Sequence, residues 1–150
     1  MDVIERLYDA FSKLDGEGMA ACYTPDAVFE DPAFGELRDG EPADMWRMLT
    51  GRAKDLEVKL LEHDDTSAHW VADYTFNTGR RVHNDVQATF KLRDGLICDH
   101  RDAFSFYAWS RQALGPVGLA LGWTPMLHAK VQKQARAGLD EFRSARGSAA

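Results

Sequence analysis

The segment YTPDAVFEDPAFGELRDG, residues 23–40, decides how the rest of the chain is interpreted. It contains a short apolar run, Val28 to Asp31, that ends directly before a proline and a loop. The run predicts a brief strand, with Asp31 as its last residue. Asp31 then allows two interpretations, because an aspartate before proline starts turns and a carboxylate among apolar neighbours is a candidate acid or base.

Apolar residues at helical spacing lie on both sides of this segment. A first helix is expected from Val3 to Leu14, and Asp2 with Glu5 resembles a capping box at its start. A second, short helix carries Tyr23 near its end and stops at the following proline. A third helix follows the loop, with one apolar face over residues 43–53.

The period changes to strand-like alternation from Leu56 onward, and the intervening segments DDTS, NTGRR and RDG are typical of turns. Short turns join antiparallel neighbours, so a mainly antiparallel meander is expected. Helices followed by a meander predict an α+β domain, whose curved sheet can leave an apolar cavity on its concave face. The four expected strands are residues 56–63, 68–77, 82–92 and 96–107.

The chain continues past this meander. Residues 114–123 are apolar and interrupted by glycines, and a further amphipathic helix is expected from Pro125 onward. We therefore predict one domain over residues 1–107, a helical extension packed on it over 108–143, and a flexible tail over 144–150. A flap over the cavity, a wall of the pocket and a dimer clasp all fit the extension.

The amino-acid composition limits which kinds of binding partner are expected for this chain. With 150 residues, a net charge of -6 and a pI near 5.3, the chain is not expected to bind nucleic acid. The basic residues Lys130, Lys133 and Arg136 are assigned to a solvated helix face. Cys22 and Cys98 lack CxxC spacing and are expected to be buried thiols. Residues 114–123 fall short of the roughly 20 residues of a membrane span, so they can touch a membrane or a ligand without crossing. The N-terminus does not resemble a signal peptide, which predicts a cytoplasmic protein.

The quoted segment, the helix after it and the hairpin-rich second half together resemble the nuclear transport factor 2-like superfamily. That superfamily includes ketosteroid isomerases, SnoaL-type polyketide cyclases, limonene epoxide hydrolase and scytalone dehydratase. The resemblance covers about Val3 to Tyr107. It implies a cone-shaped (cystatin-like) α+β domain with three N-terminal helices on a curved, mainly antiparallel sheet. It also implies a homodimer through the sheet, a hydrophobic small-molecule partner and no cofactor. A metal held by His100, Asp102 and one of His69 or His83 is an alternative, but none is expected because no tight His/Asp ligand motif such as HExxH occurs.

The nearest local match is to ketosteroid isomerases, in which the aspartate of an EDP segment is the base that moves a proton. Asp31 occupies that position. A superposition without gaps places the family's tyrosine donor at Leu7 and its second acid at Ala88, and neither side chain can donate a hydrogen bond. Tyr8 is adjacent to the first of these positions but is rotated by about 100° around the helix. The resemblance therefore does not extend to steroid isomerisation.

Side chains alternate between two faces on the last expected strand, CDHRDAFSF, so one face carries His100, Asp102, Phe104 and Phe106. The superposition on ketosteroid isomerases orients this face toward the interior of the cone. The backbones of His100 and Asp102 are then roughly 6–7 Å apart, so the imidazole and the carboxylate can meet. Asp31 is expected to approach them from across the cavity.

These residues suggest acid/base chemistry. Asp31 is assigned as the base, His100 as the proton donor or substrate-polarising group, and Asp102 as the residue that orients His100 and sets its tautomer. Burial and a neighbouring imidazolium shift carboxyl pKa values in opposite directions, which allows an acid and a base near neutral pH. The residues assigned to the pocket wall are Trp46, Ala88, Phe104, Phe106 and Tyr8.

The expected function is that of a small cofactor-independent enzyme for isomerisation, cyclisation, dehydration or hydration of a hydrophobic oxygenated molecule. Epoxide hydrolases of the superfamily are less similar, because they use an arginine and an aspartate on one face, whereas Arg101 and Asp102 alternate. Alternatives are a ligand-binding module of the same fold, or an assembly surface with an outward apolar patch around Trp70, Tyr74 and Phe76.

Overall fold

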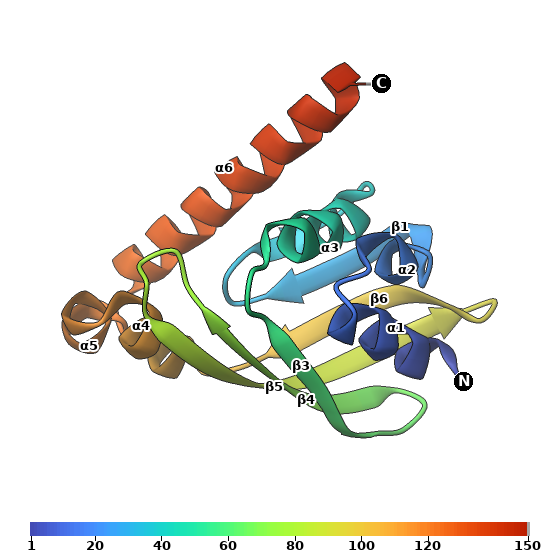
Figure 1. Cartoon of the computed structure of the whole chain (residues 1–150), viewed down its shortest axis with the longest axis horizontal. Helices are drawn as coiled ribbons and strands as arrows, with labels where there is room; N and C mark the ends of the chain where they lie inside the picture. The colour runs from blue at the N-terminus through green and yellow to red at the C-terminus, as the bar shows by residue number, and fades with distance from the viewer. Residues whose placement is uncertain (150) are drawn as a thin grey trace.

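The computed structural model describes the backbone of residues 1–149 and the side chains of residues 1–147, and Figure 1 shows its arrangement. Helices and strands follow the α+β order predicted from the periodicity. The elements are α1 (Val3–Ser12), α2 (Gly16–Ala20), β1 (Tyr23–Asp31), β2 (Gly35–Leu37), α3 (Glu41–Arg52), β3 (Glu57–His63), β4 (Ser67–Thr75), β5 (Arg81–Arg93), β6 (Leu96–Ala103), α4 (Phe106–Leu114), α5 (Pro116–Leu121) and α6 (Pro125–Ala149).

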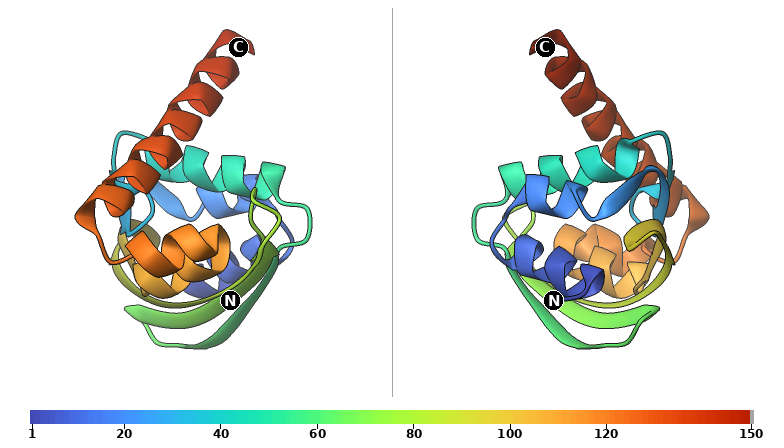
Figure 2. Two further views of the ribbon diagram at one scale, coloured as in Figure 1. Left: turned by 90° about the vertical axis from the view of Figure 1, so that its left-hand side faces the viewer. Right: turned by 90° about the vertical axis from the view of Figure 1, so that its right-hand side faces the viewer.

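The six strands form one sheet in the order β2-β1-β6-β5-β4-β3. All neighbouring strands are antiparallel except β1 and β6, which run parallel. The sheet is curved, and the N-terminal helices lie on its concave side (Figures 1 and 2). The predicted fold, a mainly antiparallel curved sheet covered by three N-terminal helices, is confirmed.

The first strand is longer than the sequence predicted, and the second helix is shorter. α2 ends at Ala20, and β1 begins at Tyr23 rather than at Val28. The reason is the pairing with β6, in which Tyr23 lies opposite Ile97 and the Ile97 amide donates to the carbonyl of Cys22. Sheet pairing thus extends the strand over residues whose local pattern is also compatible with a helix.

The last strand is shorter than predicted. β6 ends at Ala103, whereas residues 96–107 were expected to be one strand. The hydroxyl of Ser105 accepts a hydrogen bond from the amide of Ala108 at 3.1 Å and caps α4, which starts at Phe106. A serine cap satisfies a free amide of the first helical turn, and this local bond ends the extended conformation.

The alternative of an assembly surface with an outward apolar patch around Trp70, Tyr74 and Phe76 does not agree with the packing of these residues. Trp70 is buried on the concave face, and its ring lies 5.6 Å from that of Tyr8. Phe76 packs edge-on against Trp109 of α4, whose Nε1 donates to the Tyr74 hydroxyl at 2.8 Å. The three aromatic side chains therefore join α1 and α4 to the sheet.

The long helix α6 packs along α3 and projects beyond the sheet (Figure 2). Leu139 is completely buried at this contact. Arg143 pairs with Asp44 of α3 at 3.0 Å, and Arg136 pairs with Glu41 at 2.9 Å. The predicted flexible tail is also corrected here, because residues 144–149 continue α6; Ala150 lies outside the described residues.

The two cysteines differ in how deeply they are buried. Cys22 is buried as predicted, whereas Cys98 is only partly buried, and its thiol donates to the Lys91 carbonyl. Cys98 lies near the end of the β5–β6 hairpin, which leaves one side of its side chain open to solvent.

No helix in the described part of the chain has both the length and the apolar composition to cross a bilayer.

Leu139→Ala is expected to lower the free energy of unfolding by about 2–3 kcal/mol. The substitution leaves a cavity between α6 and α3, and a helix near the chain end can relax to fill part of it. Urea unfolding checks the value, with Leu92→Ala as a control because Leu92 is 42% exposed. Equal stabilities of the two variants would contradict the anchoring role of Leu139.

Candidate active site

The parallel pairing of β1 and β6 brings two carboxylates together. Phe29 lies opposite His100 in this register, and both side chains are fully buried on the concave side. Two residues further along each strand, Asp31 and Asp102 return to the same face as neighbours, because side chains alternate and adjacent strands are about 4.8 Å apart. The expectation that Asp31 reaches the site from across the cavity is therefore wrong.

A chain of hydrogen bonds holds Asp102 from behind. Nε1 of Trp46 donates to the hydroxyl of Tyr23 at 2.8 Å, and this hydroxyl contacts Nδ1 of His100 at 2.8 Å. Nε2 of His100 contacts Oδ1 of Asp102 at 2.8 Å, which confirms that the imidazole and the carboxylate meet. All four side chains are buried.

The types of donor restrict the direction of these hydrogen bonds. The indole of Trp46 can only donate, so the Tyr23 oxygen accepts that hydrogen bond. In a neutral imidazole with its proton on Nε2, the Tyr23 hydroxyl donates to Nδ1 and Nε2 donates to Asp102. The ring of His100 is also enclosed by aromatic side chains, with that of Phe90 at 4.4 Å. Both nitrogens of His100 are engaged, so its most direct effect is to orient Asp102.

Asp31 fits both interpretations made from its sequence position. Oδ1 accepts hydrogen bonds from the amides of Ala33 at 2.9 Å and Phe34 at 2.6 Å. These bonds form the turn that is expected where an aspartate precedes a proline. Burial raises the pKa of Asp31 from 3.8 to about 7; the amide of Phe34 opposes this shift, and the charge of Asp102 adds to it. Because both turn bonds go to Oδ1, the carboxyl retains Oδ2 for proton transfer.

Two buried polar atoms on the concave face, the hydroxyl oxygen of Tyr8 and Nε1 of Trp70, make no hydrogen bond of regular geometry with the described residues. The two groups lie close to each other, with the indole of Trp70 as the donor toward the Tyr8 hydroxyl. Burial raises the pKa of Tyr8 well above 10, and the charge of Asp102 adds to this effect. Buried polar groups are nearly always paired, so groups without a regular hydrogen bond in this position are typical of a site that receives polar atoms from a ligand.

The predicted wall residues divide between two places. Ala88 is buried directly opposite Asp102 on β5, so a short side chain lies beside the acid. Phe104 is partly buried between the main core and the cluster under α4. Phe106 does not share a strand face with Asp102, because it lies on α4 and stacks on His128 at 4.2 Å. The predicted placement of Phe106 is thus corrected by the end of β6.

Tyr23 and Trp70 were missed as site residues by the sequence reasoning. Tyr23 was assigned to a helix, although Pro25 follows two residues later and disfavours helical backbone just before it. Trp70 alternates with Ala68 and Ala72 on one face of β4, and all three are buried. Alternation with small residues was a signal that this face points inward.

A small cavity of about 120 Å³ lies apart from the two carboxylates. It is bounded by α2, β1 and the start of α3, and the unpaired hydroxyl of Thr24 is at its wall. Its lining is mostly apolar, and Tyr23 is the site residue that it shares. The lining residues are Ala20, Tyr23, Thr24, Pro25, Ala27, Gly40, Pro42 and Ala43.

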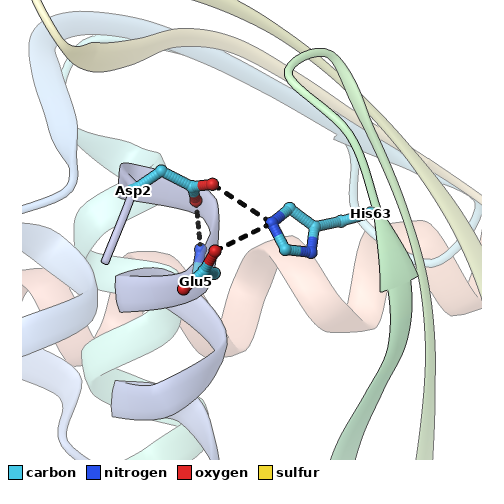
Figure 3. A group of neighbouring side chains, drawn as sticks. All are labelled: Asp2, Glu5 and His63. Carbon is cyan, nitrogen blue, oxygen red and sulfur yellow. Dashed lines mark hydrogen bonds and ion pairs between the residues drawn. The ribbon is translucent and has the colours of Figure 1, made fainter.

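Asp2, Glu5 and His63 form a group of metal-ligand type at the start of α1 (Figure 3). Oδ1 of Asp2 accepts from the Glu5 amide at 2.8 Å, which confirms the predicted helix cap. Nε2 of His63 lies 3.1 Å from Asp2 Oδ2 and 3.3 Å from Glu5 Oε1. These atoms already satisfy one another, and the partial positive charge of a helix N-terminus favours carboxylates over a metal cation. We assign the group to helix capping.

The curved sheet wrapped around N-terminal helices, with polar side chains on its concave face, defines the nuclear transport factor 2-like class of small α+β proteins. The sequence profile of SnoaL-like domains matches residues 4–100, which is well over half of the chain. The chain belongs to the SnoaL-like domain family. None of the curated protein sequences compared with it matches.

Solved structures support the same fold. A limonene epoxide hydrolase-like (LEH-like) epoxide hydrolase of Mycobacterium tuberculosis is 25% identical, covers 83% of this chain and 92% of its own, and superposes with a TM-score of 0.60. A candidate polyketide cyclase of Xanthomonas campestris is 18% identical, with coverages of 73% and 93% and a TM-score of 0.59. A protein of Catenulispora acidiphila with a ketosteroid isomerase-like fold, in complex with trimethylamine, is 15% identical, with coverages of 82% and 97% and a TM-score of 0.61.

Proposed function

We propose that the protein is a small acid/base enzyme that acts without a cofactor on a hydrophobic, oxygenated small molecule. The observation that carries this proposal is the β1–β6 register, which runs to Glu30 opposite Arg101 and so puts Asp31 next to Asp102, together with the effect of the Asp102 charge on the pKa of Asp31. Membership of the SnoaL-like family supports the substrate class, because solved relatives include proteins described as polyketide cyclases and as an epoxide hydrolase.

Asp31 is the proposed proton carrier. A general acid or base works best when its pKa is close to the working pH, and the pKa of Asp31 is about 7. Near neutral pH the ionised form can remove a proton from carbon or water, and the protonated form can return a proton to oxygen. Isomerisation, cyclisation, dehydration and hydration all consist of such transfers.

The proposed role of His100 differs from the one inferred from the sequence. Its two nitrogens are occupied by Tyr23 and Asp102, so we propose that His100 positions Asp102 instead of donating to the substrate. The negative charge of Asp102 raises the pKa of Asp31 and so adds to the effect of burial, which is the larger cause. Asp31 and Asp102 are then the two groups that face the reacting atoms.

A substrate oxygen would be held by the Tyr8 hydroxyl on the concave side. This hydroxyl is buried and can donate one hydrogen bond, because the indole of Trp70 faces it as a donor. A carbonyl or ether oxygen that accepts this bond would gain electrostatic stabilisation as negative charge develops on it. The surrounding aromatic and aliphatic side chains favour a hydrophobic carbon skeleton.

Hydration of an epoxide is a second candidate, favoured by the 25% identity with the mycobacterial LEH-like epoxide hydrolase. In this reaction protonated Asp31 would give its proton to the epoxide oxygen while Asp102 takes a proton from the attacking water. The C–O bond of the ring breaks as the new C–O bond forms. Arg101 would take no part, because it pairs with Asp99 and Glu30 on the outer side of the sheet.

The test is a panel of two substrate classes. Reaction of hydrophobic ketones is monitored by deuterium exchange at carbon, and reaction of hydrophobic epoxides is monitored by diol formation. Asp31→Asn and Asp102→Asn should each lower turnover by about 10²- to 10⁴-fold. Glu30→Gln is the matched control, because Glu30 is the exposed neighbour of Asp31 on the same strand. Tight ligand binding without turnover of any member would instead favour the non-catalytic binding module.

Tyr8→Phe separates catalysis from folding. Removing a buried hydroxyl without a regular hydrogen bond should leave the free energy of unfolding unchanged or raise it by about 1 kcal/mol. The same change should lower turnover of the best substrate by about tenfold or more, because the substrate oxygen loses a donor. Urea unfolding and steady-state kinetics measure the two effects. A loss of stability with normal turnover would show that the hydroxyl serves the fold.

The homodimer through the sheet stays a prediction. The outer side of β4 and β5 carries paired polar groups, with His69 bonded to Asp85 at 2.8 Å and His83 to Asp73 at 2.7 Å. Such a surface would form a polar interface. Sedimentation of the purified chain measures the oligomeric state, and disruption by His69→Glu would place the interface there.

A further inference from the structure

The segment after β6 packs with its small residues inward and its large apolar residues outward. A Cβ atom at Gly118 would lie 1.9 Å from the carbonyl oxygen of Ser110, and one at Gly122 would lie 2.2 Å from the Ser110 hydroxyl. These glycines are therefore pressed against α4. Since one side of α5 is taken up by glycine contacts, its larger side chains project into solvent.

These projecting apolar side chains are called the outer patch below. Its residues occur within one stretch of the chain, residues 117–126, and no charged residue lies between positions 112 and 129. Single exposed apolar residues are common, but a group of this kind marks an interaction site. The outer patch consists of Val117 (53% exposed), Leu119 (57%), Leu121 (44%), Trp123 (73%) and Met126 (75%).

The charged residues of the chain segment that carries the outer patch are positive, although the whole chain carries -6. Residues 103–139 contain no aspartate or glutamate. Lys130 and Lys133 follow Met126 at helical spacing on the exposed side of α6, and Arg111 lies on α4. None of these three cations has an ion-pair partner within the part of the chain that the structure describes.

We propose that the outer patch binds the surface of an anionic lipid membrane, with its apolar side chains in the interfacial layer and the three cations at the lipid headgroups. An exposed tryptophan beside lysines and aliphatic side chains is the composition that binds at such an interface. Binding is peripheral, because α5 has only six residues. The proposal does not depend on the proposed enzymatic activity.

Charge also favours a lipid surface over a second copy of the chain. A two-fold contact through the outer patch would bring Lys130, Lys133 and Arg111 of one copy close to the same cations of the other. Like charges that face each other across an interface are unfavourable. An anionic headgroup layer, in contrast, attracts each nearby lysine or arginine by about 1 kcal/mol.

Trp123 provides a direct measurement. Of the four tryptophans, Trp46, Trp70 and Trp109 are at least 94% buried, so Trp123 alone reports on the outer surface. The full chain is titrated with vesicles of phosphatidylcholine alone and of phosphatidylcholine with about 30% phosphatidylglycerol. We expect a blue shift of the emission with the anionic vesicles, which Trp123→Phe removes while binding measured by co-sedimentation is retained.

Two double variants test the two parts of the proposal. Leu119→Ser with Trp123→Ser should weaken vesicle binding by about tenfold or more, and the control Leu61→Ser with Leu92→Ser, exposed apolar residues elsewhere, should not. Lys130→Gln with Lys133→Gln should weaken it by about twentyfold at low salt. The control for charge is Lys54→Gln with Lys59→Gln, both exposed.

Several outcomes would overturn the proposal. One is equal binding to neutral and anionic vesicles, or no binding to either. Another is sedimentation that shows a dimer which Leu119→Ser with Trp123→Ser converts into a monomer, since the outer patch would then belong to an interface between copies. A third is equal weakening by the variants and their controls.

Discussion

Asp31→Asn is expected to abolish turnover and, at the same time, to make the folded protein more stable at pH 8. Asparagine keeps the oxygen that accepts hydrogen bonds from Ala33 and Phe34, so the turn is preserved. It cannot carry a proton to or from a substrate. Turnover should therefore fall by about 10²- to 10⁴-fold, as measured on the best substrate of the panel.

The gain in stability follows from the pKa of Asp31. This pKa is raised from 3.8 to about 7 in the folded protein, so between these values the folded state keeps a proton that the unfolded chain releases. The contribution of Asp31 to stability is complete below about pH 4 and is lost as the pH rises through 7. At pH 8 the uncharged asparagine escapes this loss, and the variant should be more stable by up to about 4 kcal/mol.

Urea unfolding of the wild type and Asp31→Asn at pH 4 and pH 8 measures this difference. The two proteins should have nearly equal stability at pH 4 and diverge at pH 8. Glu30→Gln, one residue away but exposed, should show neither the kinetic nor the stability effect. If Asp31→Asn is less stable than the wild type at pH 8, Asp31 is only a turn residue and the proposed catalytic role fails.

His100→Leu is expected to lower the free energy of unfolding by about 3–5 kcal/mol. Leucine fills much of the space of the imidazole but bonds neither the hydroxyl of Tyr23 nor the carboxylate of Asp102. The carboxylate would then remain buried without its partner, which is the costly part of the change. Urea unfolding at pH 7 gives the value.

His69→Leu is the matched control for this variant. His69 also contacts an aspartate at 2.8 Å, but on the outer side of the sheet, where exposed pairs contribute less than about 1 kcal/mol. Adding Asp102→Asn to His100→Leu should restore part of the stability, since the buried charge is removed. If the double variant is as unstable as the sum of the single changes, the two residues do not act as a pair.

Much of the fold could be predicted from local patterns. The spacing of apolar residues in α1 and the alternation in β4 and β5 each reflect one buried face, and those elements were placed nearly as observed. The cap at Asp2 and the turn after Asp31 are also local, because a side chain bonds to amides two or three residues away. His100 and Asp102 were placed inside by the same alternation, which their burial confirms.

The errors have two origins. Where a segment fits two conformations locally, its partner elsewhere in the chain can decide between them, and residues 23–27 became strand because β6 pairs with them. Phe106 became helical for a local reason, the cap at Ser105, which the alternation pattern did not reveal. The extension turned its leucines outward because the glycines of α5 fit against Ser110.

The sequence by itself determined that this protein has amphipathic helices, alternating strands and a carboxylate at the end of an apolar run before proline. Only the tertiary structure decided that β1 and β6 pair in parallel, which places Asp31 beside Asp102 and leaves His100 behind them, bonded to Tyr23. The physical reason is that a periodic pattern records which face of a segment is buried. The pattern does not specify which strand pairs with a given strand. The chemistry of this site depends on that pairing, because it is the neighbour β6 that brings Asp102 next to Asp31.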